Sequence, residues 1–133
     1  MRSVSAGLGL VLLLCWLPLS AQPQPVVHIV LLWLKQPGDS MQRQQLIQAS
    51  QALRQIPGIR RLQLGEALPS ERTIVDDSFD VALVFTFDDA AAMQRYLVHP
   101  LHKQIVKRDI KPLVSRIRAH DFVDVEARDF DKK

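Results

Sequence analysis

The chain has 133 residues, of which 47% are apolar and 23% are charged, with a single cysteine and a formal charge of +3 at pH 7. This length allows one domain, and the composition excludes a disulfide framework, a cysteine-based zinc module and a collagen-like chain. The apolar content is too high, and the net charge too small, for an intrinsically disordered protein.

The first 21 residues are typical of an export signal. Met1-Arg2 gives a positive start, residues 6–19 are almost wholly apolar, and Ser20-Ala21 supplies small residues for cleavage. The alternative is a membrane anchor, but the apolar run is shorter than the roughly 20 residues that cross a bilayer, and Pro18 lies within it. We therefore expect a signal peptide over 1–21, a short linker over 22–25, and a periplasmic or secreted protein with no stable membrane anchor. Cleavage would also remove Cys15, the only thiol.

The segment 26–34 is apolar at nearly every position and predicts a strand that is covered on both faces. One face would carry His28, Val30, Leu32 and Leu34. Asp39 or Ser40 then caps a helix that begins near residue 41 and is stopped by Pro57-Gly58. A second strand over 59–65 and a polar connection over 66–78 follow.

The segment 79–87 predicts the third strand, because aromatic and branched residues alternate along it. Its apolar side would carry every second residue from Phe79 to Phe87. Asp88 or Asp89 caps a helix over 90–98, and Pro100 suits the first turn of a short continuation over 101–109. A fourth strand is predicted over 113–122, followed by a loose tail over 123–133, so the domain spans 26–122.

Two β-α-β halves within 100 residues predict an α+β, ferredoxin-like βαββαβ fold, with a four-stranded antiparallel sheet and both helices on one face. The first and third strands are nevertheless apolar on both faces. An apolar sheet face of that size needs a partner, and the simplest partner is a second copy. We therefore expect a homodimer in which two sheets face each other as an α/β barrel.

The segment Tyr96-Leu-Val-His99-Pro100-Leu-His102 is the best candidate for chemistry. His102 and Tyr96 could form an acid–base pair, because a neutral imidazole accepts a proton near pH 7 and a phenol can hold a carbonyl oxygen. The structural alternative is that His99 caps the turn before Pro100 and Tyr96 packs in the core. The candidate ligand pocket consists of His28, Val30, Leu32 and His99. His99 and His102 could share one face of a helix, but no third ligand is fixed by spacing, so neither a metal nor another cofactor is predicted.

A basic stretch follows this segment, with only Asp109 opposing its charge. No aromatic residues interleave with it, and an exported protein seldom meets nucleic acid. We therefore interpret it as a solvated face and expect no nucleic-acid partner. Its members are Lys103, Lys107, Arg108, Lys111, Arg116 and Arg118.

Several segments together resemble the stress-responsive α/β-barrel (Dabb) domain family. The most specific is the Tyr-x-x-His-Pro-x-His pattern from Tyr96 to His102. The resemblance runs from about residue 26 to 122 and implies a ferredoxin-like subunit in a dimeric α/β barrel. The other matching segments are Val27-His28-Ile-Val-Leu, Ile56-Pro57-Gly58-Ile59, Leu64-Gly65, the strand from Phe79 to Phe87, and Asp121-Phe122.

The resemblance implies a role in stress responses, although many members of the family have no assigned reaction. One plant member is a cyclase that closes a polyketide chain by aldol condensation, using a Tyr and a His that match Tyr96 and His102 and a pocket His that matches His28. Val81 stands where that cyclase has a second His.

Three functions remain open. The first is the binding of a small apolar or carbonyl-containing molecule in the barrel cavity. The second is cofactor-independent acid–base catalysis of the cyclase or lyase type, in which His102 removes a proton next to a carbonyl. The third, an oxygenase-like activity, rests on analogy of fold alone.

Overall fold

The computed structural model describes residues 23–127, and the elements follow the predicted order. The expected signal peptide (1–21) and most of the expected tail lie outside the described residues. The elements are β1 (Val26–Leu34), α1 (Ser40–Ala52), a 3₁₀ turn (Leu53–Gln55), β2 (Ile59–Glu66), β3 (Val81–Phe87), α2 (Ala90–Val98), α3 (Pro100–Ile105), a π-helical turn (Val106–Ile110) and β4 (Val114–Val123).

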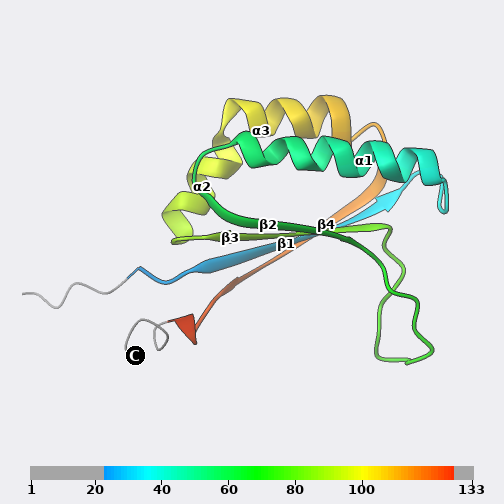
Figure 1. Ribbon diagram of the computed structural model, residues 1–133, viewed down its shortest axis with the longest axis horizontal. Helices are drawn as coiled ribbons and strands as arrows, with labels where there is room; N and C mark the ends of the chain where they lie inside the picture. The colour runs from blue at the N-terminus through cyan, green and yellow to red at the C-terminus, as the bar shows by residue number, and fades with distance from the viewer. Residues whose placement is uncertain (1–22, 128–133) are drawn as a thin grey trace, which may run out of the picture.

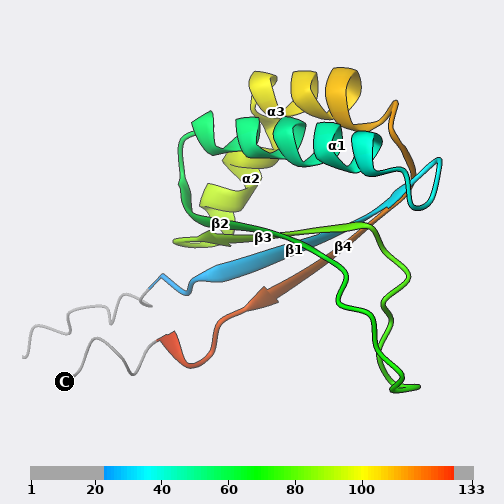
Figure 2. The ribbon, with the colours of Figure 1, turned by 45° about the vertical axis from the view of Figure 1, so that its right-hand side comes forward.

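The four strands form one antiparallel sheet in the order β2-β3-β1-β4. All the helices lie on one face of this sheet, and the views in Figures 1 and 2 agree on the two-layer arrangement. The predicted α+β, ferredoxin-like fold is therefore confirmed.

β1 lies in the middle of the sheet between β3 and β4, and its side chains alternate between the two faces. The residues that face the helices include His28, Leu32 and Leu34, which are buried. The opposite face of β1 is only partly covered. It carries Val27, Ile29, Leu31 and Trp33. We call this second side of the sheet the open face.

Helix α1 begins at Ser40, directly after its N-cap residue Asp39. The Asp39 carboxylate accepts hydrogen bonds from the backbone N–H groups of Met41 and Gln42, at 2.9 and 3.0 Å. The helix buries Leu46 against the sheet and ends in the 3₁₀ turn. Gly58 then adopts a φ of +96°, a left-handed conformation that glycine tolerates without strain, and the chain enters β2.

Of the two candidate caps of α2, the structure selects Asp89, whose carboxylate accepts from the Ala92 N–H at 2.7 Å. α2 ends at Val98, and His99 adopts an extended backbone before Pro100, as the residue preceding a proline prefers. The continuation predicted over 101–109 starts one residue earlier, at Pro100. It becomes π-helical from Val106 to Ile110.

The third strand is shorter than predicted, because Asp80 is tied to the neighbouring strand. Its N–H donates to the Leu32 carbonyl at 2.9 Å, and its carboxylate accepts from the Leu34 N–H at 2.8 Å. Phe79 therefore does not continue the core row of β3, as the alternation had suggested. It lies edge-on to Trp33, with ring centroids 6.4 Å apart.

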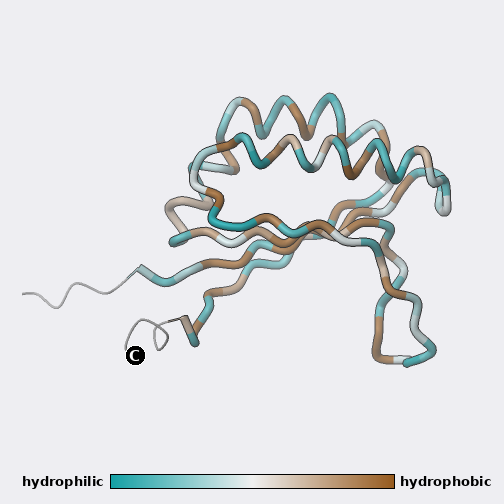
Figure 3. Tube along the Cα trace, in the orientation of Figure 1, coloured by the Kyte–Doolittle hydropathy of each residue, from teal (hydrophilic) through white to brown (hydrophobic). Residues whose placement is uncertain are grey.

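The core lies between the sheet and the helices and is rich in aromatic rings. Phe85 and Phe87 of β3 and Tyr96 of α2 are each at most 1% exposed. Figure 3 shows hydrophobic stretches along the strands and on the helices above them, and further ones in the connection between β2 and β3.

Replacement of Leu46 by Ala tests this core. Leu46 is fully buried, so Leu46→Ala should lower the free energy of unfolding by about 2–5 kcal/mol through lost burial and a residual cavity. Met41→Ala on the same helix is the matched control, because Met41 is 73% exposed, and its effect should stay within about 0.5 kcal/mol. Urea unfolding at one protein concentration measures the free energy of unfolding of both variants. Equal losses in the two variants would contradict the packing described here.

Candidate functional site

Three side chains predicted for the site meet between the sheet and the helices. His28 comes from β1, Tyr96 from α2 and His102 from α3. The Tyr96 and His102 rings lie 4.6 Å apart between centroids, and the Tyr96 and His28 rings lie 6.5 Å apart. The fold thus gathers residues from three separate elements into one cluster, which we call the His–Tyr cluster.

Tyr96 is held at the centre of this cluster by the core itself. Its ring packs against Phe85 and Phe87, with centroid separations of 5.1 and 5.2 Å. Burial raises the pKa of the phenol well above its ordinary value, because the phenolate would lose its hydration. The hydroxyl therefore stays protonated and can donate a hydrogen bond.

His102 carries a buried polar atom that lacks a partner. Its Nδ1 makes no hydrogen bond to any of residues 23–127. Burial lowers the pKa of His102, and this effect outweighs the opposing effect of the Leu97 backbone, which raises it. The nearby His28, His99 and Lys103 lower the pKa further. His102 is therefore neutral at pH 7 and can accept a proton.

His28 is oriented by Asp121, a residue whose role is not evident from the sequence. In the sheet, His28 lies directly opposite Asp121 of β4, and its Nδ1 contacts the Asp121 carboxylate at 2.5 Å. A carboxylate only accepts, so Nδ1 of His28 carries the hydrogen of this contact. Asp121 was recognisable only as part of the Asp121-Phe122 pattern, since the pairing register is needed to place it beside His28.

The remaining predicted pocket residues have different surroundings. Val30 is partly buried and Leu32 is 1% exposed, and both lie on the same face of β1 as His28. His99 acts as the structural alternative describes, because its Nδ1 accepts from the Leu101 N–H at 3.1 Å and caps α3.

The His–Tyr cluster lies on the helix-covered side of the sheet. A ligand that touches it would therefore lie inside one subunit rather than on the open face, which would line the space between two sheets. Strand β4 is the most exposed strand beside this cluster, with only Val114 buried among its residues. The Asp121 side chain is 46% exposed, and the register places Ile117 and Val123, 41% and 44% exposed, on the same side.

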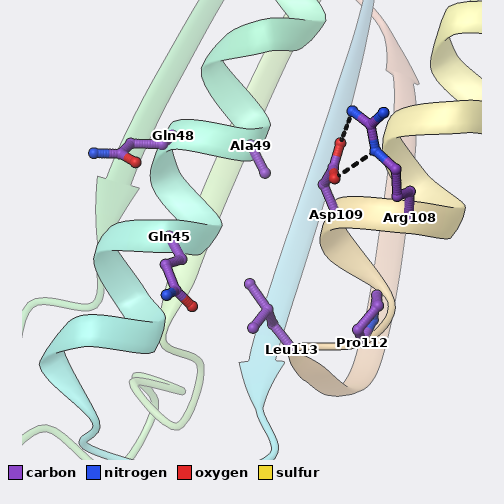
Figure 4. A pocket seen from close by; sticks show the side chains of 7 residues that line it. All are labelled: Gln45, Gln48, Ala49, Arg108, Asp109, Pro112 and Leu113. Carbon is purple, nitrogen blue, oxygen red and sulfur yellow. Dashed lines mark hydrogen bonds and ion pairs between the residues drawn. The ribbon is translucent and has the colours of Figure 1, made fainter.

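A separate pocket of about 400 Å³ lies between α1 and the π-helical turn (Figure 4). The Arg108 guanidinium and the Asp109 carboxylate pair in it at 2.8 and 2.9 Å. Its lining contains none of the residues of the His–Tyr cluster. The lining residues are Gln45, Gln48, Ala49, Arg108, Asp109, Pro112 and Leu113.

Three other features considered in the sequence are a metal site, the basic stretch and a membrane-spanning segment. Within residues 23–127, His, Asp and Glu side chains form no group of three that could hold a metal ion. The residues of the basic stretch are all exposed, and Arg116 lies 3.6 Å from the centre of the Trp33 ring on the open face. No helix in the described part of the chain has the length and apolarity needed to span a membrane.

The family assignment follows from the sequence and the fold together. The model of the Dabb family, described as the stress responsive A/B barrel domain, matches residues 26–124. The chain therefore belongs to this family, as the Tyr96–His102 pattern had indicated. A comparison with curated proteins gave no match.

Solved structures with the same fold come from bacteria and a plant. A Dabb family protein with a ferredoxin-like fold from Mesorhizobium loti is 25% identical, with a TM-score of 0.62, and the match covers 77% of this chain and 98% of that one. A dimeric ferredoxin-like protein from Thermobifida fusca is 24% identical, with a TM-score of 0.63 and coverages of 80% and 96%. The hydroxynitrile lyase from Passiflora edulis is 23% identical, with a TM-score of 0.67 and coverages of 78% and 96%.

The lowered pKa of His102 predicts a pH dependence of stability. An unfolded histidine titrates near pH 6.5, whereas folded His102 takes up its proton only at lower pH. Below pH 6.5 the unfolded chain therefore binds more protons, and the free energy of unfolding falls as the pH falls. His102→Gln removes this contribution, so the wild type should lose more stability than the variant between pH 7.5 and about pH 5.

Urea unfolding across this range measures the effect. His120→Gln serves as the control, because His120 is exposed on β4, and it should follow the wild-type curve. Parallel curves for the wild type and His102→Gln would show that burial does not disfavour the imidazolium.

Proposed function

We propose that this Dabb protein is exported, forms a homodimer, and binds a small, largely apolar molecule bearing a carbonyl group at the His–Tyr cluster. The observation that carries the binding proposal is the buried Nδ1 of His102, which has no partner within residues 23–127 and lies on a ring next to Tyr96. Buried polar atoms are nearly always hydrogen-bonded, so an unpartnered one beside a phenol favours a ligand that completes both.

The donors and acceptors of the cluster define the class of ligand. Tyr96 can donate to a carbonyl oxygen, while the free Nδ1 lone pair of His102 can accept from a hydroxyl or enol. On His28, Nε2 is the ring nitrogen left for a ligand, because Asp121 occupies Nδ1. The apolar part of the ligand would rest against Ile117 and Val123 at the uncovered edge of β4.

The homodimer is inferred from the open face. This face presents a row of partly buried apolar side chains along the central strand, and the simplest cover is the same face of a second copy. The Thermobifida fusca protein and a ferredoxin-like protein from Bacteroides fragilis, 19% identical with a TM-score of 0.59, are both described as dimeric. Export is inferred from residues 1–21 alone.

Ligand binding is tested by calorimetric titration with a medium-chain aliphatic methyl ketone. The wild type should bind, and the double variant Tyr96→Phe/His102→Gln should bind at least about tenfold more weakly, because both polar partners of the carbonyl end are lost. His120→Gln should bind as the wild type does. Equal affinity of the double variant and the wild type would place the ligand elsewhere. Native mass spectrometry of the exported protein would identify a retained natural ligand.

A second candidate function, acid–base catalysis, is favoured by the protonation states of the pair. His102 is neutral and able to take a proton, while Tyr96 remains a protonated donor. In this reaction Nδ1 of His102 removes a proton from the carbon next to the carbonyl, and the C–H electron pair forms an enolate whose oxygen is held by Tyr96. The hydroxynitrile lyase from Passiflora edulis indicates that this fold can support an enzyme.

Deuterium exchange of the same ketone in D₂O tests for proton abstraction without a full reaction. An enzyme should accelerate exchange at the carbons next to the carbonyl by at least about 100-fold over buffer, as observed by NMR. His102→Gln should abolish the acceleration, while Tyr96→Phe should reduce it with the base still present. Binding of the ketone without accelerated exchange would contradict the catalytic function and leave the binding function standing.

A further inference from the structure

The connection between β2 and β3, residues 67–80, is a second feature that needs a partner. It projects away from the sheet on the side opposite the helices, as both Figure 1 and Figure 2 show. Its returning limb is fixed to the open face, because the Trp33 indole N–H donates to the Ser78 hydroxyl at 3.0 Å and Phe79 packs edge-on against the same ring. We call this connection the arm.

The arm has a defined internal structure. The Asp77 carboxylate accepts from the Ser70 N–H at 2.8 Å and so ties its two limbs together. The Val75 N–H donates to the Arg72 carbonyl at 3.0 Å, and the Asp76 carboxylate accepts from the Ser78 N–H and hydroxyl at 3.0 and 2.6 Å. An arm shaped by these bonds can dock with little further loss of conformational entropy.

Two large aliphatic side chains on the arm lie in solvent. Leu68 and Ile74 are each 83% exposed, more than any other exposed large hydrophobic residue in the described part of the chain. Two large aliphatic side chains this exposed on one structured projection are available for contact with a partner.

We propose that the arm docks on a second copy of this chain, so that the arm of each subunit in the dimer contacts the other subunit. This inference rests on the proposed homodimer. The second copy is favoured because the arm rises from the open face, which makes its surface continuous with the apolar row that the dimer would bury. By twofold symmetry, the two arms of a dimer would make equivalent contacts.

Charge complementarity supports the same occupant. The arm carries the carboxylates of Glu71, Asp76 and Asp77 against the single guanidinium of Arg72. A fourth carboxylate, that of Asp80, is turned into its own subunit, where it pairs with Arg43 at 3.8 Å. The strand register places Arg116 and Arg118 of β4 and Arg61 of β2 on the open face. Arg116 and Arg118 already lower the pKa of Asp76 within one subunit. Glu71 and Asp77 are the carboxylates left to attract the basic border of a second copy across an interface.

The experiment is sedimentation of the wild type and of the variant Leu68→Ser/Ile74→Ser over a range of concentrations. The variant should have a dimer dissociation constant at least about tenfold higher than the wild type, because both aliphatic contacts are lost. The matched control is Met41→Ser/Val98→Ser, which removes two exposed apolar side chains, 73% and 60% exposed, from the helix layer. The control should dimerise as the wild type does.

A photo-crosslinking residue at position 68 gives a measurement that does not depend on the double variant folding. Crosslinks should join two chains, whereas crosslinks only within one chain would contradict the docking of the arm on a second copy. A wild-type monomer at micromolar concentration would overturn the homodimer and the arm together. A wild-type dimer whose affinity is unchanged in Leu68→Ser/Ile74→Ser would overturn the arm alone.

Discussion

The central strand β1 imposes the constraint on which the rest of the structure depends. It is apolar on both faces and lies between β3 and β4, so apolar side chains must be covered above and below the sheet. The helices cover one face and complete the core around Phe85, Phe87 and Tyr96. Among the described residues, only the arm lies over the other face, at one end. The apolar side chains left uncovered on this one strand are the reason for proposing a second subunit.

The same strand also carries the buried imidazole around which the candidate site is arranged. His28 occupies a core-facing position of β1 and is 7% exposed, so its ring nitrogen needs a partner, which Asp121 supplies from the edge strand. His102 differs, because its Nδ1 is buried and unpartnered in the described structure. The core satisfies one imidazole and leaves a nitrogen of another without a partner among the described residues, and this contrast is the physical basis of the proposed function.

Local signals predicted most of the elements, because each depends on a few neighbouring residues. The cap at Asp39, the stop at Pro57-Gly58 and the break at Pro100 lie where turn and cap chemistry place them. The start of β3 was misplaced, since alternation continues through Phe79 in the sequence while Asp80 bonds to β1 in the fold. Long-range bonds of this kind leave no local pattern.

The sequence by itself determined the fold class, the family and the pairing of Tyr96 with His102, because hydropathy, caps and a short motif all act over a few residues. Only the tertiary structure placed the candidate site on the helix-covered side of the sheet and brought Asp121 to His28 through the register of β1 against β4. It also decided that His99 serves as a cap and that Leu68 and Ile74 stand in solvent. The reason is the same in each case: burial and hydrogen-bond partners depend on strands and helices that are distant in the chain and adjacent only after folding.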